Sequence, residues 1–139
     1  MILLDSSFVI AYHNARDVHH PAAAPAMRDL VAGVWGHALL LEYVFLEVVT
    51  VLLARRGLAT ASTVGTFLMQ AREVEFVPCS QIFHDTLSTF RSQRGPTKSL
   101  LSFTDAAIVT VARQRDASFL ATFDSDFESI ESISVVPGS

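Results

Sequence analysis

Short apolar runs alternate along the chain with longer segments whose apolar residues recur at helical spacing. Strands are predicted at Met1 to Leu4, Val34 to His37, Val74 to Pro78, Phe119 to Phe123 and Ile133 to Val136. Helices are predicted over about 6–14, 22–31, 40–56, 60–72, 81–93 and 103–114. Short apolar strands that alternate with helices are typical of a parallel sheet covered on both faces. We therefore expect residues 1–139 to form one three-layer α/β/α domain with a central, mostly parallel sheet.

The composition supports a folded protein that does not enter a membrane. Half of the 139 residues are hydrophobic and 17% are charged, which is far from the signature of a disordered chain. The most apolar stretch, Leu39 to Ala54, is short for a membrane span and carries Glu42 and Glu47. Cys79 is the single cysteine, so no internal disulfide forms. These features favour a cytoplasmic protein.

The net charge of −4 bears on any nucleic-acid substrate. The field of the whole protein does not attract a polyanion, so local basic groups or bound cations would have to hold it. Arg91, Arg94 and Lys98 form the densest basic run and flank a Gly-Pro turn. They are candidates for gripping RNA phosphates, although cations at a helix end and on a solvated loop explain them at least as well.

Glu47 is the most informative single residue. From Tyr43 to Ala54 every other side chain except Thr50 is apolar, and a helix that is apolar all round is expected to be buried. A buried carboxylate is costly unless it is paired, protonated or bound to a metal, and no cation lies one helical turn away. A hydrogen bond to a neighbour, or an outward-pointing side chain, is the alternative.

Three further acids fall at strand ends or helix starts. Asp5 closes the first strand, Asp105 stands three residues after Ser102 in the spacing of a capping box, and Asp124 follows the apolar run to Phe123. Each could simply cap a helix. Capping does not explain why three acids can share one sheet edge while a fourth sits in an apolar helix. A cluster of carboxylates provides the oxygen ligands that Mg²⁺ and Mn²⁺ prefer, and these ions catalyse phosphodiester hydrolysis.

These motifs, in this order, resemble those of PIN-domain ribonucleases along nearly the whole chain. The matching segments are Leu3-Leu4-Asp5-Ser6-Ser7, Glu47 in its hydrophobic helix, Thr104-Asp105-Ala106-Ala107 and Thr122-Phe123-Asp124-Ser125-Asp126-Phe127. Within that family they look most like the toxins of VapBC-type toxin–antitoxin modules. One departure is Ala38-Leu39-Leu40, where many relatives carry Ser or Thr before the long helix.

The resemblance implies an endoribonuclease that depends on Mg²⁺ (or Mn²⁺). Its acidic quartet would be Asp5, Glu47, Asp105 and Asp124, with Asp126 as an auxiliary metal ligand and Ser7 or Thr104 as polar support. It further implies a homodimer and a cognate antitoxin whose C-terminal segment places an arginine among the acids.

Three alternatives remain open at this stage. A housekeeping PIN nuclease would have the same site without an antitoxin. A PIN scaffold that only binds RNA or protein is disfavoured by the presence of all four acids. A receiver-like signalling module needs a lysine at a strand end, whereas the only lysine, Lys98, is predicted in a loop.

Overall fold

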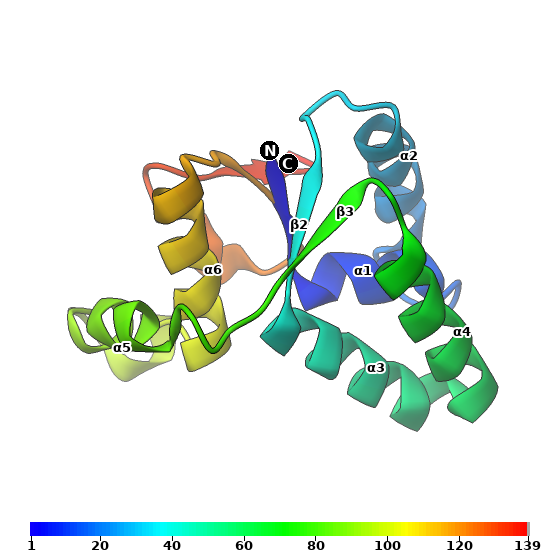
Figure 1. Ribbon diagram of the computed structural model, residues 1–139, viewed down its shortest axis with the longest axis horizontal. Helices are drawn as coiled ribbons and strands as arrows, with labels where there is room; N and C mark the ends of the chain where they lie inside the picture. The colour runs from blue at the N-terminus through cyan, green and yellow to red at the C-terminus, as the bar shows by residue number, and fades with distance from the viewer. Residues whose placement is uncertain (139) are drawn as a thin grey trace.

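The structure is a computed structural model that describes residues 1–138 (Figure 1). Its strands are β1 (Ile2–Leu4), β2 (Ala38–Leu41), β3 (Val74–Val77), β4 (Phe119–Ala121) and β5 (Ser134–Val136). Its α-helices are α1 (Ser6–His13), α2 (His20–Val31), α3 (Glu42–Arg56), α4 (Leu58–Gln70), α5 (Phe83–Arg91) and α6 (Phe103–Arg115). Two short 3₁₀ helices, η1 (Thr97–Ser99) and η2 (Ser125–Phe127), complete it.

The five strands form one sheet in the order β3-β2-β1-β4-β5, and every neighbouring pair is parallel. Helices α1 to α4 lie on one side of this sheet, and α5 and α6 lie on the other (Figure 1). Every residue of β1 and β2 is buried, as a parallel sheet covered on both faces requires. The predicted three-layer α/β/α fold is confirmed, and the sheet is parallel throughout.

The second strand was predicted in the wrong place. It is Ala38–Leu41, not Val34 to His37, and the long helix begins at Glu42 rather than near Leu40. A continuous apolar run does not distinguish a doubly buried strand from a buried helix by its periodicity. Pairing with β1 on one side and β3 on the other makes Ala38–Leu41 a strand, because both neighbours provide hydrogen-bond partners for its backbone.

The beginning and the end of α3 are fixed by different residues. Leu41 precedes the helix and provides no side-chain cap, in keeping with the absence of Ser or Thr there. The Glu42 carboxylate instead accepts a hydrogen bond of 3.1 Å from the backbone N–H of Cys79, which ties the start of α3 to the segment after β3. Gly57 ends the helix as predicted, with a φ of 90° that favours glycine.

The sheet order brings the carboxyl ends of β1 and β4 together. Leu4 pairs with Ala121, and the Asp5 N–H donates to the Ala121 carbonyl at 3.0 Å. Asp5 and Thr122 therefore leave neighbouring strands side by side, at the edge where ligands bind in open α/β sheets. None of the helices in residues 1–138 has the length and apolar character needed to cross a membrane.

Candidate active site

Asp5 is the buried centre of the site. It follows β1 directly and is 4% exposed. Its Oδ2 accepts hydrogen bonds from the Thr122 hydroxyl at 2.6 Å and the Ser7 hydroxyl at 2.9 Å. Burial raises the pKa of Asp5 above its ordinary value of 3.8, these two hydrogen bonds act in the opposite direction, and the charge of Asp124 adds to the rise. The carboxylate is thus held in place by neutral donors.

Thr122 joins two of the predicted acids. Its hydroxyl donates to Asp5 and accepts the backbone N–H of Asp124 at 2.9 Å, and its side chain is almost fully buried. Ser7 makes a parallel link, because its oxygen accepts the Phe123 N–H at 3.0 Å while its hydroxyl donates to Asp5. The predicted role of Ser7 as polar support has a structural basis, whereas Thr122 was missed although it lies inside a recognised motif.

Asp105 stands in the first turn of α6. Its backbone N–H donates to the Ser102 hydroxyl at 3.1 Å, so the N-terminal half of the predicted capping box is present. Burial, followed by the charge of Asp5, raises the pKa of Asp105 from 3.8 to about 6, and the charge of Asp124 contributes further. Asp5, Asp105 and Asp124 therefore lie within electrostatic reach of one another, although they come from three separate parts of the chain.

Asp124 also caps η2, as the local sequence suggested. Its Oδ1 accepts the Asp126 N–H at 2.9 Å. Asp126 contributes that backbone bond, and its carboxylate is not among the charges that shift the pKa of Asp5 or Asp105. The electrostatic environment of Asp126 therefore differs from that of Asp5, Asp105 and Asp124.

The expectation that Glu47 is buried is wrong. Glu47 is exposed on α3, and the neighbouring Leu46 is 54% exposed, so this apolar helix is open on one face. The apolar pattern did not reveal that face, because its leucines remain uncovered in the isolated chain. The Glu47 carboxylate accepts a hydrogen bond from the hydroxyl of Ser6, the residue next to Asp5. Ser6 therefore links Glu47 to the neighbourhood of Asp5, although the charge of Glu47, like that of Asp126, is not among those that shift the pKa of Asp5 or Asp105.

The other predicted site residues make no hydrogen bond or ion pair with the acids in residues 1–138. Thr104 is half-buried and its hydroxyl makes no hydrogen bond within residues 1–138, so no role as polar support is visible. Arg91, Arg94 and Lys98 are exposed around the connection from α5 to α6, and none forms an ion pair in the part of the chain that the structure describes. Arg94 lines a cavity of about 260 Å³ that Asp126 also lines.

The chemistry of the acids suits a hard divalent cation. Carboxylate oxygens are the donors that Mg²⁺ and Mn²⁺ prefer, and the raised pKa values of Asp5 and Asp105 reflect partly buried like charges. No basic side chain in residues 1–138 forms an ion pair with any of the four acids. In the same residues no three acidic, histidine or cysteine side chains form a ready metal cage. The donor set fits such an ion, and its side chains would have to converge on it.

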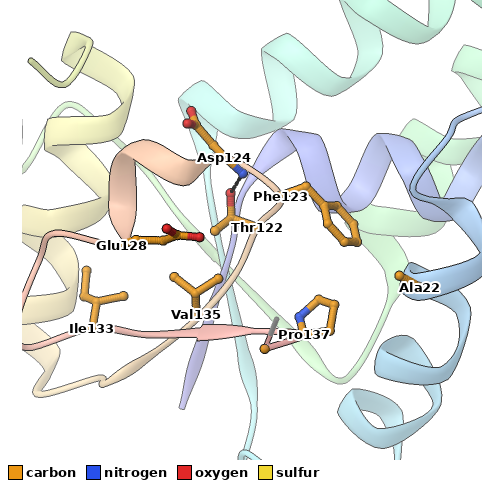
Figure 2. A pocket seen from close by; sticks show the side chains of 9 residues that line it. Ala22, Thr122, Phe123, Asp124, Glu128, Ile133, Val135 and Pro137 are labelled. Carbon is orange, nitrogen blue, oxygen red and sulfur yellow. Dashed lines mark hydrogen bonds between the residues drawn. The ribbon is translucent and has the colours of Figure 1, made fainter. Parts of the chain in front are cut away.

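A larger cavity, of about 480 Å³, opens beside Asp124 (Figure 2). Thr122, Phe123 and Asp124 form one wall, and β5 with Pro137 forms the opposite one. The Asp124 carboxylate points away from β5 in Figure 2, and its charge contributes to the raised pKa values of Asp5 and Asp105. Asp124 therefore borders both the acidic cluster and the cavity.

The comparisons with known proteins agree with this arrangement. The family model described as PIN domain matches residues 2–132. A crystal structure of VapC20 from Mycobacterium tuberculosis, described as a sarcin-ricin loop cleaving toxin, superposes with a TM-score of 0.79 and 21% sequence identity, covering 94% of this chain and 95% of that chain. No curated protein matches the sequence. At 21% identity the likeness to VapC20 supports the fold, and the family model, which spans most of the sequence, shows that the chain belongs to the PIN domain family.

Proposed function

We propose that the chain is a metal-dependent endoribonuclease, with residues 1–139 acting as one catalytic domain. The observation that carries the proposal is that Asp5, Asp105 and Asp124 are partly buried within electrostatic reach of one another, while no basic side chain in residues 1–138 forms an ion pair with them. Like charges held together in a partly buried place are costly unless a cation compensates them. Membership in the PIN domain family supports a nuclease.

Asp5, Asp105, Glu47 and Asp124 would hold Mg²⁺ or Mn²⁺, with Asp126 as an auxiliary ligand. A divalent cation supplies polarisation of the scissile phosphate and a lowered pKa for the attacking water. Arg91, Arg94 and Lys98 would grip RNA phosphates beside the site.

The chain's own contribution is to position the acids. The hydroxyls of Thr122 and Ser7 orient the Asp5 carboxylate without neutralising it. The Ser6 hydroxyl holds Glu47 next to the same acid. The backbone N–H of Asp126 orients Asp124 in a similar way. Because these donors are neutral, the negative charge of the site stays available for a cation.

The test is cleavage of a mixed RNA substrate by the purified protein in Mg²⁺, in Mn²⁺ and in EDTA. We expect cleavage in either metal, none in EDTA, and a loss of at least about 100-fold in Asp5→Asn, since groups that act as a unit fail together. Asp29→Asn is the matched control, because Asp29 is exposed on α2 and its side chain makes no hydrogen bond within residues 1–138. Full activity of Asp5→Asn, or undiminished cleavage in EDTA, would contradict the proposal.

We also propose that this nuclease is a cytoplasmic homodimeric toxin held inactive by an antitoxin. The likeness to VapC20, a toxin, supports this, although at low identity. Several large apolar side chains on α3 and α4 are exposed, which supports a surface that another protein chain covers; they are Leu46, Leu53, Leu58, Phe67 and Met69. A guanidinium from the antitoxin would pair with the acids, because arginine matches carboxylate geometry.

Co-expression with the small gene beside this one tests the toxin role. We expect a copurifying protein that suppresses RNA cleavage, and light scattering of the free toxin should give a dimer mass. If the neighbour neither copurifies nor inhibits, the housekeeping nuclease replaces the toxin. If no RNA is cut under any condition, the non-catalytic scaffold replaces both.

A further inference from the structure

We propose that the cavity beside Asp124 receives a guanine base of the RNA and that the Glu128 carboxylate recognises it. This inference rests on the proposed ribonuclease function and adds a sequence preference to it. The argument comes from the lining of the cavity, from the position of Glu128 and from the hydrogen-bonding groups of the four RNA bases.

The cavity has the size and lining of a small-ligand site. Its volume of about 480 Å³ falls within the usual range of roughly 300–1,000 Å³ for such sites. Phe123, Val135 and Pro137 provide apolar walls, and two carboxylates, Asp124 and Glu128, border it. Among the residues that line the cavity there is no lysine, arginine or histidine. An anion such as a phosphate is therefore disfavoured, and a flat, neutral group that carries hydrogen-bond donors is favoured.

Phe123 is a well-supported wall. The exposed ring of His19 stacks on it with centroids 4.4 Å apart and an angle of 5° between the ring planes. Phe8, which is fully buried, lies against it with centroids 6.0 Å apart. The backbone N–H of Phe123 is bound by Ser7. Because His19 covers a face of this ring and Phe8 packs against it, a base in the cavity would contact the edge of Phe123 or replace the exposed His19 ring on it. Proteins that read single-stranded RNA commonly place unstacked bases against aromatic side chains.

Glu128 is separate from the acidic cluster. Its backbone N–H donates to the Ser125 carbonyl at 3.1 Å, which fixes it at the end of η2. Figure 2 shows its side chain on the β5 side of Thr122, whereas the Asp124 carboxylate points the other way. In the described part of the chain the Glu128 carboxylate has no hydrogen bond and no ion pair. Glu128 is exposed, so its carboxylate is accessible to hydrogen-bond donors of a ligand in the cavity.

Guanine is the base whose donors match a carboxylate. An ionised carboxylate only accepts hydrogen bonds and can accept two in parallel. On its Watson–Crick edge guanine presents two adjacent donors, N1–H and the N2 amino group. Adenine and cytosine present one donor beside an acceptor, and uracil presents one donor between two acceptors. Because Asp124 borders both the cavity and the acids, the bound guanine would be adjacent to the phosphodiester that is cut.

The test is to map the cleavage sites of a random-sequence RNA pool by sequencing. We expect guanine at one fixed position beside the cut, preferred by roughly 10- to 100-fold over the other bases, the range for one bidentate base contact. In Glu128→Gln the preference should shift from guanine toward adenine and cytosine, because the glutamine amide offers one acceptor and one donor, which matches the donor and neighbouring acceptor of these two bases. Glu131→Gln is the matched control, since Glu131 is exposed and does not line the cavity.

A second measurement does not depend on cleavage. Calorimetric titration with 5′-GMP, 5′-AMP, 5′-CMP and 5′-UMP should give the tightest binding for 5′-GMP, and Glu128→Gln should weaken it by about 10-fold or more. Absence of RNA cleavage by the wild type would remove the proposed ribonuclease function. Cleavage without a guanine preference, or a preference that Glu128→Gln leaves unchanged, would overturn the guanine proposal alone. An effect of Glu128→Gln only on binding of a protein inhibitor would also overturn it.

Discussion

Replacing Thr122 with valine removes one hydroxyl from the centre of the site and keeps the side chain nearly the same size. The hydroxyl makes a 2.6 Å hydrogen bond to Asp5 and accepts the N–H of Asp124, and Thr122 is 1% exposed, so water does not readily replace it. The variant therefore separates the orientation of the acids from their presence.

The size of the effect follows from the two bonds that are lost. A hydrogen bond to a charged group contributes about 1.5–3 kcal/mol, and the half-buried N–H of Asp124 loses its partner as well. Extra apolar contact from valine offsets part of this, so we expect the free energy of unfolding to fall by about 2 kcal/mol without metal. For a chain of this length that corresponds to a Tm lower by roughly 6 °C. The pKa of Asp5 should rise further, because the Thr122 hydrogen bond lowers it. RNA cleavage should fall by about 10- to 100-fold, as for other residues that orient metal ligands.

The assay compares three variants at neutral pH, by thermal unfolding in EDTA and by RNA cleavage in Mg²⁺. Thr122→Ser keeps the hydroxyl and should stay within a few fold of the wild type. Thr104→Val removes a threonine hydroxyl that makes no hydrogen bond within residues 1–138, and should leave both cleavage and Tm nearly unchanged. Wild-type cleavage by Thr122→Val, or a larger loss in Thr104→Val, would refute this account of how Asp5 is positioned.

Two further predictions concern stability alone. Burial and the charge of Asp5 raise the pKa of Asp105 from 3.8 to about 6. Between these pH values the folded protein without metal keeps a proton that the unfolded chain has released. The free energy of unfolding therefore falls as pH rises from about 4 to 6. After allowance for the partial exposure of Asp105, the loss of stability amounts to about 1 kcal/mol. In EDTA the Tm of Asp105→Asn should rise relative to that of the wild type as pH increases over this range. A Tm difference between the two proteins that does not change with pH contradicts the reasoning. Gly57→Ala should lower the free energy of unfolding by about 1–3 kcal/mol, measured with denaturant. No atom lies within 4 Å of the new Cβ, but a φ of 90° with a ψ of 174° disfavours any side chain. An unchanged unfolding midpoint would contradict this prediction.

The sequence predicted the layers of the fold and the three clustered aspartates because these depend on local features. Apolar runs of strand length, alternating with helices, determine a parallel sheet, and an acid directly after such a run falls at its carboxyl edge. Asp5 and Asp124 are of this kind. The place of β2 was not predictable from periodicity, because Ala38–Leu41 is buried on both faces and its pattern also suits a helix.

Contacts across the sheet explain the residues that sequence analysis missed. The bond from Thr122 to Asp5 exists because β1 and β4 are neighbours, although the two partners are 117 positions apart in the chain. The bond from Ser6 to Glu47 likewise requires α1 to pack on α3. Nothing local distinguishes Thr122 from Thr104, since both precede a motif aspartate by one or two positions. The useful signal would have been a hydroxyl directly after a strand predicted to neighbour β1.

Neutral hydroxyls, rather than cations, hold the acids, and this choice has a chemical consequence. An arginine or lysine among Asp5, Asp105 and Asp124 would lower their pKa values and stabilise the fold, but it would also fill the place of a divalent ion. Hydroxyls of Thr122, Ser7 and Ser102 fix backbone and carboxylate positions while the charge remains. Burial first, and then the charges of neighbouring carboxylates, raise the pKa values of Asp5 and Asp105. Under the proposed function, a site built in this way would bind a divalent cation, and the same property would make it a target for an inhibitor that carries a guanidinium.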